Sequence, residues 1–157
     1  MKKRYLRCLI CFFLVWLNAM CFGQVITVRI INGRNGHPLP RRSILFSPLY
    51  DKSEKAPAKY DANVRMETDS NGEAQFNLPA PLPVRVSVGV GLDFEHWRCL
   101  CAAPLFVRTQ DVIQKGIVEG SEFAMTATPL KAAPGQIVFV ARPITLFERI
   151  LSPLLRE

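Results

Sequence analysis

The chain has 157 residues, 49% of them hydrophobic and 21% charged, with a formal net charge of +7 at pH 7. Four of its 20 Lys and Arg residues lie within the first seven positions, which leaves 16 against 13 acidic residues, a net charge of +3. No basic run longer than the pair Arg41-Arg42 follows, and this excludes the electrostatic footprint of a nucleic-acid-binding protein.

Residues 1–23 have the order of a secretory signal peptide, with a basic start, an apolar core over 8–22 and a small last residue, Gly23. The core is shorter than the roughly 20 apolar residues that a membrane-spanning helix needs. A lipoprotein signal needs a small residue before its cysteine, whereas methionine precedes Cys21. We therefore predict cleavage between Gly23 and Gln24, export to the periplasm or beyond, and no integral membrane span afterwards; an uncleaved anchor or a lipid anchor is the alternative.

The first part of the mature chain predicts two strands and two loops. Alternating β-branched residues predict a strand over 24–31. Asn-Gly pairs and prolines predict a turn region over 32–40. A second strand is expected over 43–47, ended by Pro48. The mixed-charge run over 50–63 predicts a long exposed loop.

The middle of the chain contains the clearest β patterns. A short strand is expected over 64–68, and residues 69–72 predict a tight turn, because Asp and Asn bond their own backbone and Gly adopts the left-handed conformation. Residues 73–78 alternate cleanly between apolar and polar side chains. A rigid proline-rich link over 79–83 leads to 84–90, a strand with four valines on one face.

The last part predicts four strands and one short helix. The strands lie at 96–101, 105–109 and 137–141, with a short edge strand within 119–128, and the helix lies at 111–115, ended by Gly116. Both faces of the last strand are apolar, so we expect both to be covered. Thr145 can cap a helical tail with an apolar stripe, which packs on the domain or binds a partner.

Seven or eight short strands separated by turns predict a mainly β protein, an antiparallel sandwich of the Ig-like or transthyretin-like kind. The domain should span 24–142 and the tail 143–157. Cys99 and Cys101 are too few for a disulfide framework; we interpret them as reduced and buried, with a labile or intermolecular disulfide as the alternative.

Three motifs occur in order between 25 and 90: Gly36–Leu39 before the second strand, Thr68–Phe76 around the tight turn, and Val84–Val88 after the proline link. Together they resemble the carboxypeptidase regulatory-like domain, a transthyretin-like (prealbumin-like) β-sandwich found in many exported bacterial proteins. The resemblance covers about half of the mature chain and implies a non-catalytic accessory, adhesive or carbohydrate-associated module. Pro40–Arg42 and the long loop that follows depart from the family's pattern.

Catalytic and metal-binding patterns are weak. His37 and His96 lack a second ligand or an acid at a useful spacing, and no nucleophile-elbow motif occurs. Asp69–Glu73 resembles a calcium-loop fragment without the remaining oxygen ligands. The first-strand histidine and Tyr-Arg-Gly-Ser ending of the transthyretin-like hydroxyisourate hydrolases, and the His-x-His of the intradiol dioxygenases, are missing from the sequence. We predict no enzyme, no cofactor and no metal.

Phe94, His96, Trp97 and Arg98 form the cluster most typical of a binding surface, although Trp97 also fits a buried core position. The function we expect is that of an exported, non-catalytic module in protein interaction or cell-envelope structure, with an envelope protein or polysaccharide as partner. A carbohydrate-binding accessory module is the first alternative and a hydrolase the second.

Overall fold

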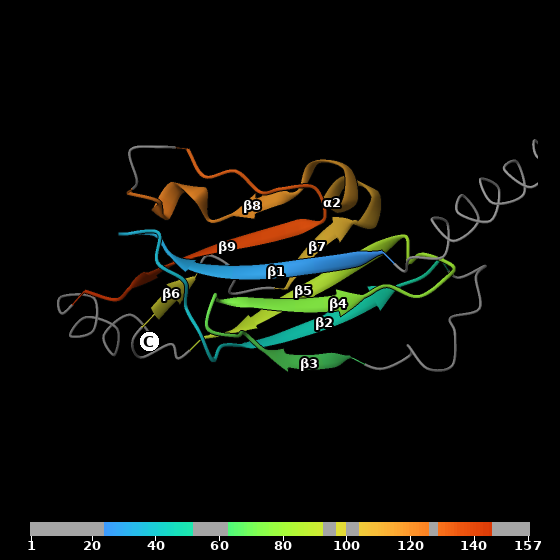
Figure 1. Cartoon of the computed structure of the whole chain (residues 1–157), viewed down its shortest axis with the longest axis horizontal. Helices are drawn as coiled ribbons and strands as arrows, with labels where there is room; N and C mark the ends of the chain where they lie inside the picture. The colour runs from blue at the N-terminus through green and yellow to red at the C-terminus, as the bar shows by residue number, and fades with distance from the viewer. Residues whose placement is uncertain (1–23, 52–62, 93–96, 100–103, 126–128, 146–157) are drawn as a thin grey trace, which may run out of the picture.

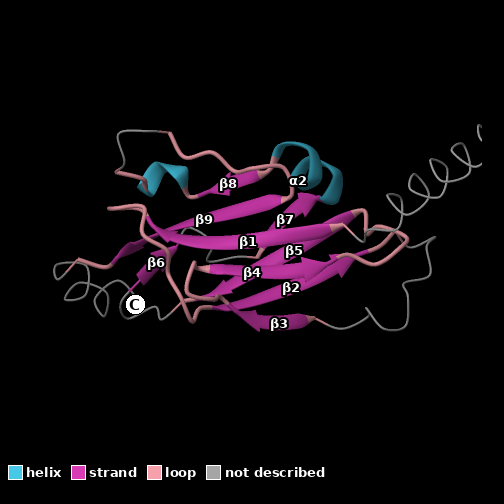
Figure 2. Cartoon of the chain, in the orientation of Figure 1, coloured by secondary structure: helices cyan, strands magenta, loops and turns pink. Residues whose placement is uncertain are grey.

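The computed structural model describes residues 24–51, 63–92, 97–99, 104–125 and 129–145. These residues form two stacked β-sheets with one short helix and one 3-10 turn (Figures 1 and 2). The expected mainly β sandwich is therefore confirmed.

The five-stranded sheet, here sheet A, has β1 and β9 at its centre. Strand β4 flanks β1, whereas β8 and β6 lie one after the other along the far edge of β9. The bounds are β1 Val25–Asn32, β4 Glu73–Asn77, β6 Trp97–Cys99, β8 Ile117–Glu119 and β9 Gln136–Pro143. Strands β1 and β8 both pair with β9 in parallel, so sheet A is mixed and the all-antiparallel expectation is wrong for it. Both faces of β9 are covered, which is the usual setting of parallel pairing.

The four-stranded sheet, here sheet B, has the order β3-β2-β5-β7 and is antiparallel throughout. The bounds are β2 Ser43–Leu49, β3 Val64–Glu67, β5 Arg85–Gly91 and β7 Leu105–Arg108. Contrary to expectation, Pro48 does not end β2 but pairs with Val86. Pairing with β3 stops at Phe46, so no described strand pairs with that edge of β2 at Pro48, and the missing N–H interrupts no described ladder there.

The main core fills the space between the two sheets. It consists of the inward-facing side chains that the period-two patterns of β1, β2, β4 and β5 predict. Phe46 of sheet B stacks on Phe76 of sheet A, with ring centroids 4.5 Å apart and planes at 12°. Burying two such rings contributes several kcal/mol, about 2 to 3 for each side chain.

A second, smaller core lies on the outer face of sheet A. Ile31, Val138 and Val140 point outward there and are covered by the chain between β8 and β9. The helix α2, Thr109–Lys115, confirms the expected helix and its glycine end. Of the short edge strand expected within 119–128, the described residues contain only Glu119, where β8 ends, because Gly120 turns the chain into the 3-10 turn η1, Ser121–Phe123. Residues 126–128 lie outside the described residues.

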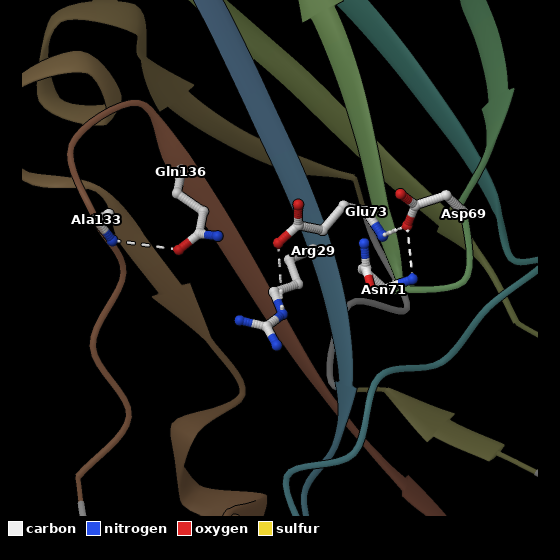
Figure 3. Close-up of polar contacts among 6 residues, drawn as sticks. All are labelled: Arg29, Asp69, Asn71, Glu73, Ala133 and Gln136. Carbon is white, nitrogen blue, oxygen red and sulfur yellow. Dashed lines mark hydrogen bonds and ion pairs between the residues drawn. The ribbon is translucent and has the colours of Figure 1, made fainter.

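The turn at 69–72 joins β3 to β4, as predicted. The Asp69 Oδ1 atom accepts hydrogen bonds from the N–H groups of Asn71, at 2.8 Å, and Glu73, at 2.9 Å (Figure 3). Gly72 has φ of 71° and its carbonyl accepts from the N–H of Ile30, so the turn is tied to β1. The carboxylate that suggested a calcium loop is therefore engaged in shaping the turn.

Several expectations fall outside the described residues: the leader over 1–23, most of the loop over 50–63, and the tail beyond Thr145. Among the helices that are described, none has the length and apolarity to cross a bilayer.

Candidate functional site

The cluster expected around the tryptophan is described only in part. Phe94 and His96 lie outside the described residues. For Arg98, only the backbone pairing in β6 is described. Trp97 is half-buried and packs against the main core, while the guanidinium carbon of Arg42 lies 5.7 Å from its ring centroid. The indole is thus packed on the domain with a cation over its ring, which disfavours it as an open platform for a sugar.

The histidine that is described does not join a site. His37 is exposed in the turn after β1, where its backbone N–H donates to Asn35 Oδ1 at 3.0 Å. Within the described ranges, no group of three or more His, Cys, Asp or Glu side chains is placed to hold a metal ion.

A different surface emerges from the register of sheet B. Ile44 and Phe46 point into the core, so the alternate residues Leu45 and Leu49 point outward; they are 39% and 36% exposed. On β7, Phe106 also points outward and is 61% exposed. Large apolar side chains thus lie on the outer face of both β2 and β7.

The strand between them carries small residues on the same face. Ser87 and Gly89 of β5 lie opposite Ser47 and Leu45 of β2. Ser87 also lies opposite Phe106 of β7. The middle of this outer face is therefore low, with larger side chains on both sides. We call the whole surface the outer face of sheet B.

Cations flank this face. Arg85 of β5 lies directly opposite Arg108 of β7, and both are exposed on the outer side. Arg65 of β3 lies opposite Leu45 at the other margin, followed by the acid Glu67 two residues on. Neither Arg85 nor Arg108 forms an ion pair with another described residue. Like charges directly opposite each other on a sheet repel, so the pair is unfavourable in the free chain.

The hydrogen-bonding pattern between β5 and β7 gives Arg85 and Arg108 the shorter of the two Cα–Cα distances found in antiparallel sheets. The N–H of Thr109 donates to the carbonyl of Val84 at 3.1 Å, which continues the β5–β7 register. Because hydrogen-bonded and non-hydrogen-bonded pairs alternate in antiparallel ladders, Arg85 and Arg108 form a non-hydrogen-bonded pair. Their Cα atoms are then about 4.5 Å apart, the closer of the two spacings.

The outer face of sheet A provides a contrast. The smaller core on this face is covered by the chain around β8, and Arg29 on the same face is paired with Glu73, Nε to Oε1 at 3.7 Å (Figure 3). Nearby, Gln136 Oε1 accepts the N–H of Ala133 at 3.2 Å, which closes the turn before β9. This smaller core and Arg29 thus have partners within the chain, whereas Val25 at the start of β1 is 42% exposed.

The comparisons identify no family. No protein-family model and no curated protein matches the chain. Among solved structures, the crystal structure of 3-chlorocatechol 1,2-dioxygenase from Rhodococcus opacus is 14% identical and covers 78% of this chain, with a TM-score of 0.42. The chain spans 61% of the length of that protein. A likeness at this level supports no inference about activity.

Sequence reasoning missed the outer face of sheet B. The available signal was the run 105–108, which lies directly before α2 and has apolar residues on both strand faces. That pattern matches a doubly covered strand as well as an edge strand with an open face. Only the pairing shows that β7 is at the edge of its sheet and that Phe106 points away from the core.

Proposed function

We propose that this chain is an exported, non-catalytic β-sandwich module that binds another protein of the cell envelope through the outer face of sheet B. The observation that carries the proposal is the combination of exposed Phe106 with the neighbouring arginines Arg85 and Arg108 on that face. Aromatic residues and arginine are enriched at protein interfaces, where they supply most of the binding free energy.

The arrangement of the face fits a protein partner. Leu45, Leu49 and Phe106 supply apolar area that the described chain leaves exposed. Between them, Ser87 is only 7% exposed and Gly89 is half-buried, so the larger flanking side chains form most of the accessible surface. The resemblance of the turn motifs to carboxypeptidase regulatory-like domains supports a binding role, because that family is mostly non-catalytic.

Export is compatible with the first described strand. Strand β1 begins at Val25, so cleavage between Gly23 and Gln24 leaves every described element intact. The carbonyl of Gln24 accepts a hydrogen bond from the N–H of Leu78 at 2.7 Å, so the new terminus remains anchored.

Site-specific photocrosslinking in the host tests the proposal. A benzophenone side chain is introduced at Leu45 on the proposed face, and at Gln75 as a matched exposed position on sheet A. We expect one discrete envelope-protein adduct from position 45 and none from 75, with reciprocal capture when the identified protein is tagged. Equal labelling from both positions would refute the assignment of the face. Retention on envelope polysaccharide with no protein adduct would favour the carbohydrate-binding alternative.

A further inference from the structure

On the edge of β7 that faces away from β5, the register defines which backbone N–H and C=O groups point outward from the sheet. The Thr109–Val84 hydrogen bond fixes which residues of β7 bond to β5. The backbone N–H and C=O groups of Val107 and Leu105 point toward β5. The N–H and C=O of Phe106, and the N–H of Arg108, therefore point away from β5. No described strand pairs with β7 on that side.

The edges of the described sheets differ in how they discourage further pairing. Strand β3 (VRME) carries two charges in four residues, and β4 (EAQFN) is polar on its outer face. Charged and short edges are common protections against strand addition. Strand β7 (LFVR) is apolar over three consecutive residues, with Leu105 and Val107 packed at the border of the core. Of these three edges, it is the one best suited to pairing.

The side chains on the two faces of β7 favour different side chains on an added strand. On the inner side, an added strand would continue the apolar row of Leu105 and Val107. On the outer side, it would lie next to Phe106 and Arg108, with Arg85 one strand further in. Because successive side chains alternate between faces, the complementary segment has apolar residues at every second position and acids between them.

We infer, building on the function proposed above, that the partner contributes an extended segment with alternating acidic and apolar side chains, which adds to β7 as a fifth strand of sheet B. Backbone hydrogen bonds to Phe106 and Arg108 fix its register, and its carboxylates neutralise the Arg85–Arg108 pair. Main-chain pairing with side-chain specificity of this kind is an established mode of peptide recognition.

Other occupants fit the edge less well. A second copy of the chain pairing through its own β7 would bring two more arginines, Arg85 and Arg108 of that copy, to the same edge, while its acid Glu67 would lie at the opposite edge of its sheet. An acidic polysaccharide would satisfy the arginines, but it lacks a β-strand backbone to satisfy the N–H and C=O of Phe106. An acidic peptide strand satisfies both groups.

Fluorescence anisotropy with the purified whole chain, at low ionic strength, provides the test. The probe is a labelled octapeptide of alternating glutamate and valine. A lysine–valine octapeptide and a scrambled peptide with glutamates and valines in separate blocks are the controls. We expect binding of the alternating acidic peptide alone, weakened about tenfold by Arg108→Glu, because that change replaces attraction to the carboxylates by repulsion.

Two comparisons isolate strand addition. Phe106→Ala removes the ring, whereas Phe106→Pro also removes the outward N–H, so we expect the proline variant to bind clearly more weakly than the alanine variant. On the unchanged chain, peptides N-methylated at every glutamate or at every valine are compared. One edge of an added strand is bonded and the other is free, so one of the two should lose binding and the other retain it. This second comparison stands even if the proline variant does not fold.

Each remaining outcome overturns the inference. Equal binding of the scrambled peptide, or equal effects of the two N-methylated peptides, would show side-chain attraction without strand pairing. Binding of oligogalacturonate in place of the peptide would indicate a polysaccharide site, and dimerisation abolished by Phe106→Pro would assign the edge to a second copy. If crosslinking from Leu45 captures an envelope protein while these peptides fail, the proposed function stands and strand addition is wrong.

Discussion

Replacing Gly72 by alanine should be among the most destabilising single-methyl additions in this domain. A Cβ atom there would lie 2.6 Å from the carbonyl oxygen of Ile30, 2.9 Å from the nitrogen of Leu39 and 3.0 Å from the Cβ of Pro38. The φ of 71° costs an L-residue about 1–2 kcal/mol. Moving the turn away would also weaken two backbone hydrogen bonds, Ile30 N–H to Gly72 and Leu39 N–H to Ile30, at about 1 kcal/mol each.

We therefore expect Gly72→Ala to lower the free energy of unfolding by about 3 kcal/mol, which is a drop of about 10 °C in Tm for a domain of this size. The matched control is Gly89→Ala on β5, where the nearest atom to a new Cβ is the Leu45 Cβ at 3.7 Å, an ordinary contact. That variant should be neutral or slightly stabilising, because glycine is unfavourable within a strand. Urea unfolding followed by circular dichroism measures both. Equal stability of the two variants would refute the turn geometry at Gly72.

Thr68→Val should cost about 2 kcal/mol in urea unfolding, since the buried hydroxyl bonds twice to the loop at 39–42, and Thr68→Ser should retain most of the stability. Thr109→Val should raise stability by about 1 kcal/mol, because its buried hydroxyl has no partner among the described residues. Arg85→Gln should slightly raise the Tm at low salt while it weakens capture of the partner, and losing both effects in high salt would confirm their electrostatic origin. Intact-mass measurement of the exported chain should give a product that begins at Gln24; retention of the leader would instead indicate an uncleaved anchor.

Local patterns predicted most of the strands because side-chain alternation is itself local. The valines of 84–90 and the apolar positions of 73–78 point inward as the period-two pattern requires, except that Val84, before β5 begins, is 49% exposed. The run 137–141 is covered on both faces, as its lack of alternation indicated. What alternation cannot supply is the partner of each strand. The parallel pairing of β1 with β9 joins residues more than 100 positions apart, and no local signal specifies it.

The proposed binding surface was hard to predict for a related reason. Leu45 and Phe106 alternate with core residues, and each sequence pattern alone is compatible with burial on both faces. Arg85 and Arg108 are separated by 22 residues, and their opposition depends on the register between β5 and β7. Trp97, which sequence analysis weighed both as ligand surface and as core, is half-buried against the core. Composition identifies residue types that suit binding, but exposure and register decide which of them form a surface.

The outer faces of the two sheets differ in how their arginines are paired, and this difference indicates what the Arg85–Arg108 pair contributes. On sheet A, the chain covers Val138 and Val140 and pairs Arg29 with an acid. On sheet B, Arg85 and Arg108 repel each other at the closer ladder spacing, yet in water the cost is only about 0.2–1 kcal/mol. Such a cost is tolerable for folding and is relieved once a carboxylate lies between the two guanidinium groups. The repulsion therefore raises the preference of this edge for an acidic strand over a neutral one, because only the acidic strand removes it.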